Sequence, residues 1–214
     1  MRTIILANGE YGELAAYRNI IQDSDLIFCA DGGTNYAYQL GIMPDCIIGD
    51  LDSIEPEVYA WYTAQGVEFI KYPARKDLTD LQIALHLAKE RNVAEIIMLG
   101  TMGKRLDHTF ANLYAGINLV LQGIKISHYT PDCWVYIANQ DIIIEGEPGD
   151  LVSVLALTDE VHGARETGFE YNLTDPIMKN SQPYAISNVL SGHRGIIEIE
   201  TGVLAVSHYF CRNP

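Results

Sequence analysis

Short, uninterrupted apolar runs recur along the first half of the chain. They lie at residues 3–7, 25–30, 45–50, 67–72 and 95–100. Runs of this length are typical of parallel strands that are buried on both faces. Between or after them, apolar residues recur at helical spacing, as in Leu78, Leu81, Leu85 and Ala88 and again from Leu106 through Phe110 to Ile117. This alternation predicts an α/β fold, a parallel sheet with helices on both faces.

The pattern changes after about Gly123. From there the apolar runs are short, and glycine, proline, asparagine and aspartate separate them; the runs lie at 124–129, 134–138, 141–145, 151–157, 184–190, 195–200 and 203–210. Many short strands with turn signals predict an all-β sandwich or barrel. We therefore predict two domains, an α/β domain over residues 1–123 and an all-β domain over residues 124–214, without a flexible linker between them.

Composition narrows the range of functions. The net charge is −14, from 14 basic and 28 acidic residues, and the chain has no run of lysine and arginine, which argues against a nucleic-acid-binding protein. No apolar run approaches the length of a membrane span, and the first apolar run is too short for a signal peptide. The four cysteines form no CxxC pair, which argues against a zinc ribbon and favours a reducing cytoplasm.

Polar clusters follow the predicted parallel strands. They lie at 30–35, 49–53 and 100–108, and a fourth cluster at 72–80 precedes a predicted helix. Ligands of open α/β sheets bind beyond the carboxyl ends of the strands. We therefore expect the four clusters to converge at one edge of the sheet.

Asp50 and Asp52 form the strongest of these signals. In an extended chain, residues i and i+2 point the same way, so the two carboxylates would be paired. Hard oxygen ligands at this spacing suit Mg²⁺, which bridges to substrate phosphates. The alternative is structural: Asp50 ends the strand, and Asp52 or Ser53 caps a helix near Pro56.

The cluster at 30–35 is weaker by itself. Gly32 and Gly33, which follow Asp31, would allow the backbone to approach a ligand closely, and a helix that begins near Thr34 would direct free N–H groups at a phosphate. The alternative is a tight turn in which Thr34 is the helix N-cap.

The remaining two clusters carry the basic residues. In the cluster at 72–80, Asp77 would be an N-cap with Asp80 at the capping-box position, and Lys76 would be a surface charge or a phosphate ligand. In the cluster at 100–108, Arg105 could hold a phosphate with its planar fork, and Asp107 could accept a proton or cap the helix. His108 has no partner visible in the sequence, and we leave it out of the chemistry.

The motifs ADGGTN, PDCIIGDLDSI, KDLTD and GTMGKRLDHTFANL occur in this order, and TGFEYNLTDPIMKNSQPYAISNVLSG follows in the second half. Together they resemble the thiamine pyrophosphokinase (thiamine diphosphokinase) family. The resemblance implies transfer of a pyrophosphoryl group from ATP to thiamine, with release of AMP. It also implies a Rossmann-like catalytic, nucleotide-binding domain, a thiamine-binding β-sandwich, and a homodimer whose subunits share the active sites.

The resemblance also assigns residues. The metal-binding carboxylates, for Mg²⁺, fall on Asp50, Asp52 and Asp80, and Arg105 and Asp107 join them as catalytic residues. The ATP-binding positions would be Asp31, Gly32, Gly33, Thr34, Lys76, Asp77, Thr79, Gly103, Lys104 and Arg105. Thiamine contacts would fall on Ser187 and Asn188, with Tyr171 stacking on a ring where some relatives carry tryptophan. The base that deprotonates thiamine would be Asp107 or one of the metal-binding aspartates.

Several other functions stay open at this point. A pyrophosphokinase for a pterin alcohol would share the N-terminal motifs. A haloacid-dehalogenase-type phosphatase also uses a DxD motif, but usually after its first strand and followed by Thr or Val, whereas here the motif follows the third predicted strand and is followed by Ser53. A metal-dependent glycosyltransferase uses DxD too, but ADGG and KDLTD would then be coincidences. A thiamine- or nucleotide-binding sensor without catalysis is the non-enzyme alternative.

Overall fold

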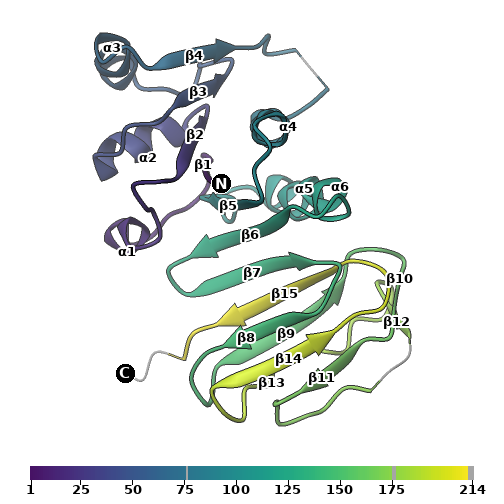
Figure 1. Ribbon diagram of the computed structural model, residues 1–214. Coiled ribbons are helices and arrows are strands. Elements are labelled where there is room, and N and C mark those ends of the chain that lie inside the picture. The colour runs from purple at the N-terminus through teal and green to yellow at the C-terminus, as the bar shows by residue number, and fades with distance from the viewer. Residues whose placement is uncertain (76, 175–176, 212–214) are drawn as a thin grey trace. The chain divides into compact units, whose positions relative to one another are not determined.

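The computed structural model describes residues 1–75, 77–174 and 177–211, and the chain divides into two compact units (Figure 1). The first unit comprises Met1–Leu119 and Gly123–Pro131. The second comprises Val120–Gln122 and the chain from Asp132 onward. Among the described residues, every helix is too short or too polar to cross a bilayer.

The first unit is built on a parallel sheet. Its strands are β1 (Arg2–Leu6), β2 (Leu26–Ala30), β3 (Cys46–Gly49), β4 (Glu68–Lys71), β5 (Glu95–Leu99) and β6 (Lys125–Thr130). They lie in the order β6-β5-β1-β2-β3-β4, and every neighbouring pair is parallel. The order reverses between β1 and β5, which is where an open α/β sheet forms its ligand crevice.

Helices connect these strands. They are α1 (Ala15–Arg18), α2 (Gly33–Leu40), α3 (Pro56–Ala64), α4 (Asp80–Glu90), α5 (Leu106–Ala115) and α6 (Ile117–Val120). In Figure 1, α1, α2 and α3 lie on one side of the sheet, and α4 and α5 lie on the other. The predicted α/β fold with helices on both faces is thereby confirmed.

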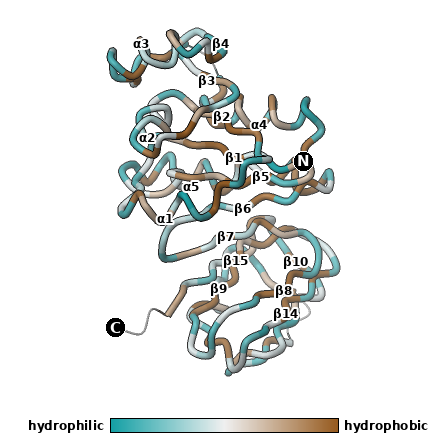
Figure 2. Tube along the Cα trace, turned by 60° about the vertical axis from the view of Figure 1, so that its left-hand side comes forward, coloured by the Kyte–Doolittle hydropathy of each residue, from teal (hydrophilic) through white to brown (hydrophobic). Residues whose placement is uncertain are grey.

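The central strands form the core of the first unit. Side chains that point to both faces of the sheet are fully buried, as in Ile4 and Ile5 of β1 and Ile47 and Ile48 of β3. The hydrophobic colouring follows β1 and β2 in Figure 2. The continuous apolar runs in the sequence are the direct consequence of this two-sided burial.

The second unit consists of antiparallel strands. One set, in the order β13-β9-β15-β7, contains β7 (Cys133–Ala138), β9 (Leu151–Ala156), β13 (Asn188–Val189) and β15 (Leu204–Tyr209). The other, in the order β11-β14-β8, contains β8 (Ile142–Glu145), β11 (Arg165–Thr167) and β14 (Arg194–Glu198). A ribbon joins β10 (Glu160–His162) to β12 (Ile177–Lys179). Val152 and Val206 of the first set and Ile144 and Ile197 of the second belong to one buried cluster, as in a β-sandwich.

The end of the first unit differs from the sequence expectation. We placed the change of fold at Gly123 and assigned residues 124–129 to the all-β half. In the structure, this segment is β6, which pairs in parallel with β5 and belongs to the first unit. Alternation within a single strand does not reveal whether its neighbour is parallel, so the sequence pattern alone did not locate this boundary.

Candidate functional site

A pocket of about 470 Å³ lies in the first unit, where the loops after its strands meet. It is lined by Ala7, Asn8, Gly9, Ala30, Asp31, Asp50, Ser53, Ala74, Leu78, Thr79, Asp80, Leu81, Gly100, Thr101, Gly103, Lys104, Arg105, His108 and Asn112. All four polar clusters that the sequence singled out contribute to this lining. The loop after β1, with Asn8 and Gly9, contributes too, and our sequence reasoning missed it although it is also a polar segment that follows a strand.

Two glycines allow these loops to approach each other closely. A Cβ atom at Gly33 would lie 2.1 Å from the carbonyl oxygen of Leu6, and one at Gly9 would lie 2.2 Å from the carbonyl oxygen of Gly100. Any side chain at either position would force neighbouring backbone segments apart. Glycine at these positions therefore holds the start of α2 and the loops after β1 and β5 together around the pocket.

The segment after β2 turns sharply at Asp31, whose φ of 46° is in the left-handed region. The Thr34 hydroxyl donates to the carbonyl oxygen of Asp31 at 2.7 Å, and Thr34 is fully buried. Helix α2 has Gly32 as its N-cap and no side-chain cap. The alternative that Thr34 caps this helix is therefore wrong. The threonine instead fixes the turn that carries the Asp31 carboxylate into the pocket.

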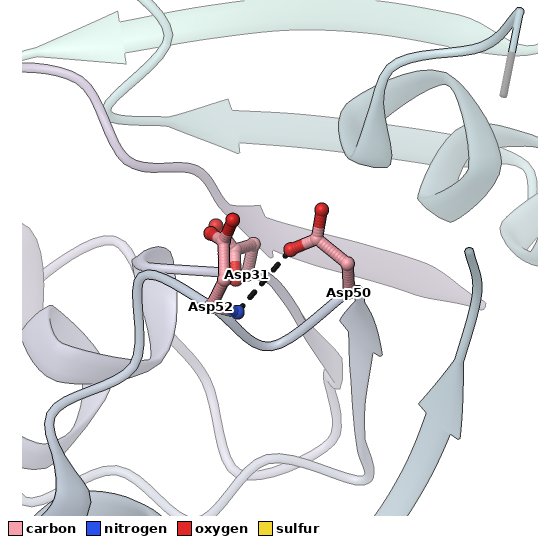
Figure 3. Close-up of side chains that lie close together, drawn as sticks. All are labelled: Asp31, Asp50 and Asp52. Atoms are coloured by element: carbon pink, nitrogen blue, oxygen red, sulfur yellow. Dashed lines mark hydrogen bonds between the residues drawn. The ribbon is translucent and has the colours of Figure 1, made fainter. Parts of the chain in front are cut away.

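Three carboxylates gather at the ends of β2 and β3 (Figure 3). Asp31, Asp50 and Asp52 each offer one oxygen, and these oxygens lie within 4.8 Å of one another. The backbone N–H of Asp52 donates to Asp50 Oδ1 at 3.2 Å, and the Ser53 hydroxyl donates to Asp52 Oδ1 at 3.0 Å. Burial raises the pKa of Asp31, and the charge of Asp80 raises it further. Three oxygens at this spacing match the ligands that Mg²⁺ prefers.

The backbone between Asp50 and Asp52 is not extended, contrary to our prediction. Leu51 has a φ of 70°, so Asp50 and Asp52 do not share a direction through extended geometry. Helix α3 has Glu55 as its N-cap and no side-chain cap, so neither Asp52 nor Ser53 caps it. The capping alternative for Asp52 and Ser53 is therefore wrong, Asp50 does follow the last residue of β3, and the metal site stays a prediction.

Asp80 is the first residue of α4. Thr79 is the N-cap, and its hydroxyl accepts from the backbone N–H of Gln82 at 3.3 Å while the Gln82 side chain accepts from the Thr79 N–H at 2.9 Å. The cap that we predicted at Asp77 is therefore wrong. Asp77 is exposed and lies outside the pocket lining, and Lys76 lies outside the described residues.

Asp80 approaches the carboxylate cluster without belonging to it. A Cβ atom at Gly49 would lie 3.1 Å from Asp80 Oδ1 and 3.0 Å from Asp31 Cβ. Both aspartates therefore flank the end of β3. In the described residues, however, the third member of the close cluster is Asp31, which we had placed at the nucleotide, and not Asp80.

The loop after β5 brings positive charge to the same pocket. Lys104, at a φ of 52°, directs its Nζ to the carbonyl oxygen of Asn8 at 3.3 Å and to the Tyr36 hydroxyl at 3.0 Å. The Lys104 backbone N–H donates to Glu10 Oε1 at 3.0 Å. A Cβ atom at Gly103 would lie 2.5 Å from Glu10 Oε2, so any other residue at this position would clash with the Glu10 carboxylate. Sequence reasoning did not single out Glu10 or Tyr36.

Arg105 and Asp107 form an exposed two-point ion pair. Arg105 Nε donates to Asp107 Oδ1 at 3.1 Å, and Arg105 Nη2 donates to Asp107 Oδ2. Hydrogen bonding to Arg105 lowers the pKa of Asp107, which makes this carboxylate a weaker base than an isolated one. Arg105 lines the pocket and Asp107 does not, whereas His108, which we had left out, does.

A buried polar group anchors this loop from behind. Thr101 Oγ1 pairs with His128 Nδ1 at 2.7 Å, and Asn112 Nδ2 donates to the Thr101 carbonyl oxygen at 2.8 Å. Burial lowers the pKa of His128 to about 3, so its imidazole is neutral near pH 7. No spacing in the sequence signalled this contact, because β6 brings His128 to Thr101 from 27 residues away.

The thiamine positions implied by the resemblance lie in the second unit. Tyr171 is 72% exposed, and Ser187, with a φ of 60°, donates its N–H to Ser153 Oγ at 2.9 Å. Asn188 is buried, and its side chain makes four hydrogen bonds within the protein. Direct contact between Asn188 and thiamine would require one of these bonds to break.

Comparison with known proteins agrees with this division of the chain. Residues 17–128 match a family model described as "Thiamin pyrophosphokinase, catalytic domain", and residues 140–204 match "Thiamin pyrophosphokinase, vitamin B1 binding domain". The chain belongs to the thiamine pyrophosphokinase family. The catalytic-domain match ends within β6, so family membership also favours placing this strand in the first unit.

Relatives in this family match along most of their length. The thiamine pyrophosphokinase of Bacillus subtilis (strain 168) is 27% identical over 95% of this chain and 97% of its own. Thiamine pyrophosphokinase 1 of Oryza sativa subsp. japonica is 26% identical over 76% of this chain and 70% of its own. The crystal structure of the Bacillus subtilis protein covers 98% of this chain and 99% of its own, at 26% identity and a TM-score of 0.86. Thiamin pyrophosphokinase from Candida albicans shares the fold, at 17% identity, a TM-score of 0.82 and coverage of 97% of this chain and 88% of its own.

Proposed function

We propose that the protein is a thiamine pyrophosphokinase, which transfers the pyrophosphoryl group of ATP to the hydroxyl of thiamine and forms thiamine diphosphate and AMP. The observation that carries the proposal is the meeting of Asp31, Asp50 and Asp80 with Lys104 and Arg105 around one pocket, in a chain that matches both domains of this family. Asp52 lies outside the lining but clusters with Asp31 and Asp50. Such a pocket offers ligands for a metal–phosphate complex and cations for the transferring group.

We assign the metal site to Asp50 and Asp52, with Asp31 as the third carboxylate and Asp80 beside them. The spacing of the oxygens and their chemical hardness both suit Mg²⁺. Mg²⁺ bound there would offset the negative charge of the phosphates. Since the cluster alone would repel ATP, this assignment explains how an acidic chain can use a nucleotide.

The basic side chains would position and stabilise the transferring group. Lys104 is already directed along the pocket by Asn8 and Tyr36. Arg105 is paired with Asp107, but both side chains are exposed and water screens their attraction, so the guanidinium can exchange Asp107 for a phosphate at little cost. The residues that follow β2, from Asp31 to Thr34, and Thr79, which lines the pocket, would complete the ATP-binding site.

Thiamine would bind to the second unit through Tyr171, whose exposed ring can stack on an electron-poor or cationic ring. Ser187 would contribute a polar contact. The base that deprotonates the thiamine hydroxyl would come from the pocket carboxylates rather than from Asp107, because Arg105 lowers the pKa of Asp107.

We further propose that the enzyme is a homodimer with active sites at the subunit interface. Leu106, Phe110 and Tyr114 lie four residues apart along α5 and are 71%, 59% and 51% exposed. A stripe of this kind, directly after Arg105, would be covered by a second copy of the chain. Because Cys29, Cys46, Cys133 and Cys211 are all free, we place the enzyme in the cytoplasm.

One experiment tests the activity. The purified protein is incubated with ATP, Mg²⁺ and thiamine, and thiamine diphosphate and AMP are quantified by chromatography. Equal amounts of both products are expected, with none when EDTA replaces Mg²⁺ and no inhibition by a hydroxymethyl-pterin. Thiamine binding in a calorimeter without product would instead identify a silent binding protein, and light scattering on the same sample measures the oligomeric state.

A further inference from the structure

A carboxyl group lies in the interior of the second unit, where nothing in the sequence suggested a functional residue. Glu166 of β11 is 1% exposed, and its strand neighbour across the ladder is Ile197, a member of the apolar core. Within the described residues, Glu166 Oε1 is buried and has no hydrogen-bond partner. Burial raises the pKa of this group. A buried carboxyl oxygen without a hydrogen bond destabilises the folded state, which points to a functional reason for Glu166 at this position.

The other oxygen of Glu166 is connected to the backbone of Tyr171 through the side chain of Asn188. Glu166 Oε2 accepts from Asn188 Nδ2 at 2.6 Å. The same Asn188 nitrogen donates to the Tyr171 carbonyl oxygen at 2.6 Å, and Asn188 Oδ1 accepts from the Tyr171 N–H at 3.1 Å and from the Val189 N–H at 3.0 Å. An amide side chain has two donor hydrogens and two acceptor sites, so the capacity of Asn188 is fully used.

The Asn188 amide holds the backbone of Tyr171 itself. Residues 170–173 belong to no strand, and two backbone hydrogen bonds flank Tyr171: the Glu170 N–H donates to the Val189 carbonyl oxygen at 2.8 Å, and the Glu166 N–H donates to the Leu173 carbonyl oxygen at 2.9 Å. Between them, both backbone polar groups of Tyr171 bond to the Asn188 side chain, and Glu166 fixes the rotation of that side chain from the core. The result is an exposed aromatic ring on a backbone that is held from within.

We propose that Glu166 is a positioning residue for the thiamine substrate, acting through Asn188 to hold the Tyr171 ring where it stacks on thiamine. The inference rests on the proposed function, since it names part of the thiamine site. A ring that is ordered before binding costs less entropy when the substrate arrives. Loss of Glu166 therefore weakens thiamine binding, whereas ATP binding and the chemistry in the first unit are unaffected.

The experiment compares four variants in steady-state assays. Glu166→Ala removes the acceptor, and its KM for thiamine rises about tenfold, as expected for loss of one hydrogen-bonded contact, while kcat and the KM for ATP stay within about twofold. Glu166→Gln keeps a carbonyl oxygen for Asn188 and restores the KM. Glu166→Leu loses the acceptor without a large cavity, so it gives the same result if the alanine variant does not fold. Glu170→Ala, which changes an exposed carboxylate on the same segment, leaves the KM unchanged.

Two further measurements separate positioning from a general loss of structure. The double variant Glu166→Ala/Asn188→Ala raises the KM for thiamine no more than Asn188→Ala alone, because both residues act through one connection. Hydrogen exchange of a peptide spanning residues 168–173 speeds up in the Glu166 variants that lose the acceptor and not in Glu170→Ala. An unchanged KM for thiamine in both folded Glu166→Ala and Glu166→Leu, additive effects in the double variant, or unchanged exchange would each overturn the proposal.

The exchange measurement does not require activity. If the wild-type protein forms no thiamine diphosphate, the proposed function fails, and calorimetric titration with thiamine then takes the place of the KM. If the Glu166 variants of an inactive protein exchange faster at residues 168–173, Glu166 still positions the Tyr171 backbone. Unchanged exchange in these variants would reject that role.

Discussion

The two units hold their candidate site residues in opposite ways. In the first unit, Asp31, Asp50, Asp52 and Arg105 are charged side chains on loops that follow parallel strands. Asp50, Asp52 and Arg105 form hydrogen bonds within their own loops, and the Ser53 N–H donates to Asp31 Oδ1 from the neighbouring loop. In the second unit, the exposed Tyr171 carries no charge, and a buried side chain holds its backbone.

The difference reflects what each unit is proposed to bind. Charges that face a metal ion and phosphates gain their energy from Coulomb attraction, which tolerates small displacements of the loops. An aromatic ring that stacks on another ring depends on distance and plane, so its backbone must be fixed. Substitutions in the first unit should therefore affect turnover, and those in the second should affect the KM for thiamine.

The carboxylate cluster should give the largest effect. Asp52→Ala removes one of three clustered oxygens, and we expect kcat to fall by about a hundredfold or more, as for loss of an electrostatic contact to the transition state. The protein should remain folded, since Asp52 is exposed and caps no helix. Assays of thiamine diphosphate formation and thermal melts measure both, with Glu57→Gln on α3 as an exposed control. Normal turnover in Asp52→Ala would remove this residue from the metal site.

The second-largest effect on kcat is expected at Arg105. Arg105→Lys keeps the positive charge but loses the planar fork, and we expect kcat to fall roughly thirtyfold. The KM for thiamine should not change, because the effect belongs to the first unit. Arg91→Lys, at the exposed C-cap of α4, is the matched control. A rise in the KM for thiamine with unchanged kcat would contradict the division between the two units.

Much of the fold and part of the site could be read from the sequence. The buried parallel strands leave continuous apolar runs, and the polar clusters that follow them converge because the carboxyl ends of parallel strands share one edge. Asp50 and Asp52 were singled out as candidates in this way. Asp31 joined them only in the structure, because its place depends on the left-handed turn after β2.

Other site features left no local signal. Glu166 and His128 lie in strands that contain other polar residues, RET in β11 and KISHYT in β6. Glu166 bonds to Asn188 of another sheet, and His128 bonds to the loop after the neighbouring strand, so both partners are distant in the chain. A polar residue among other polar residues of a strand does not tell whether its side chain faces the core. The helix caps also differed from expectation: Thr79 took the place of Asp77 because the capping box needed Gln82 three residues later.

Substitutions of Tyr171 test whether the second unit affects the KM for thiamine rather than kcat. Tyr171→Ala should raise the KM for thiamine about tenfold, the equivalent of about 1.4 kcal/mol for a lost stacking contact, with kcat nearly unchanged. Tyr171→Phe keeps the ring and should behave like the wild type, which separates stacking from any role of the hydroxyl. Steady-state kinetics at saturating ATP measure both variants. If alanine lowers kcat instead, Tyr171 acts in the reaction and not in substrate binding.

The smallest effect concerns the buried residue that anchors the first unit's loop. The pKa of His128 is about 3 in the folded protein and about 6.5 in an unfolded chain. Between these values the unfolded chain binds a proton that the folded protein does not, so stability is full above pH 6.5 and is lost as the pH falls. From pH 6.5 to 5.5, the wild type should lose about 1 kcal/mol more unfolding free energy than His128→Asn, measured in urea. His86→Asn, at an exposed histidine of α4, should keep the wild-type dependence. If unfolding free energy depends on pH equally in the wild type and His128→Asn, the imidazole paired with Thr101 is not neutral in the folded protein. The first unit would then have no buried positioning residue comparable to Glu166 at this loop.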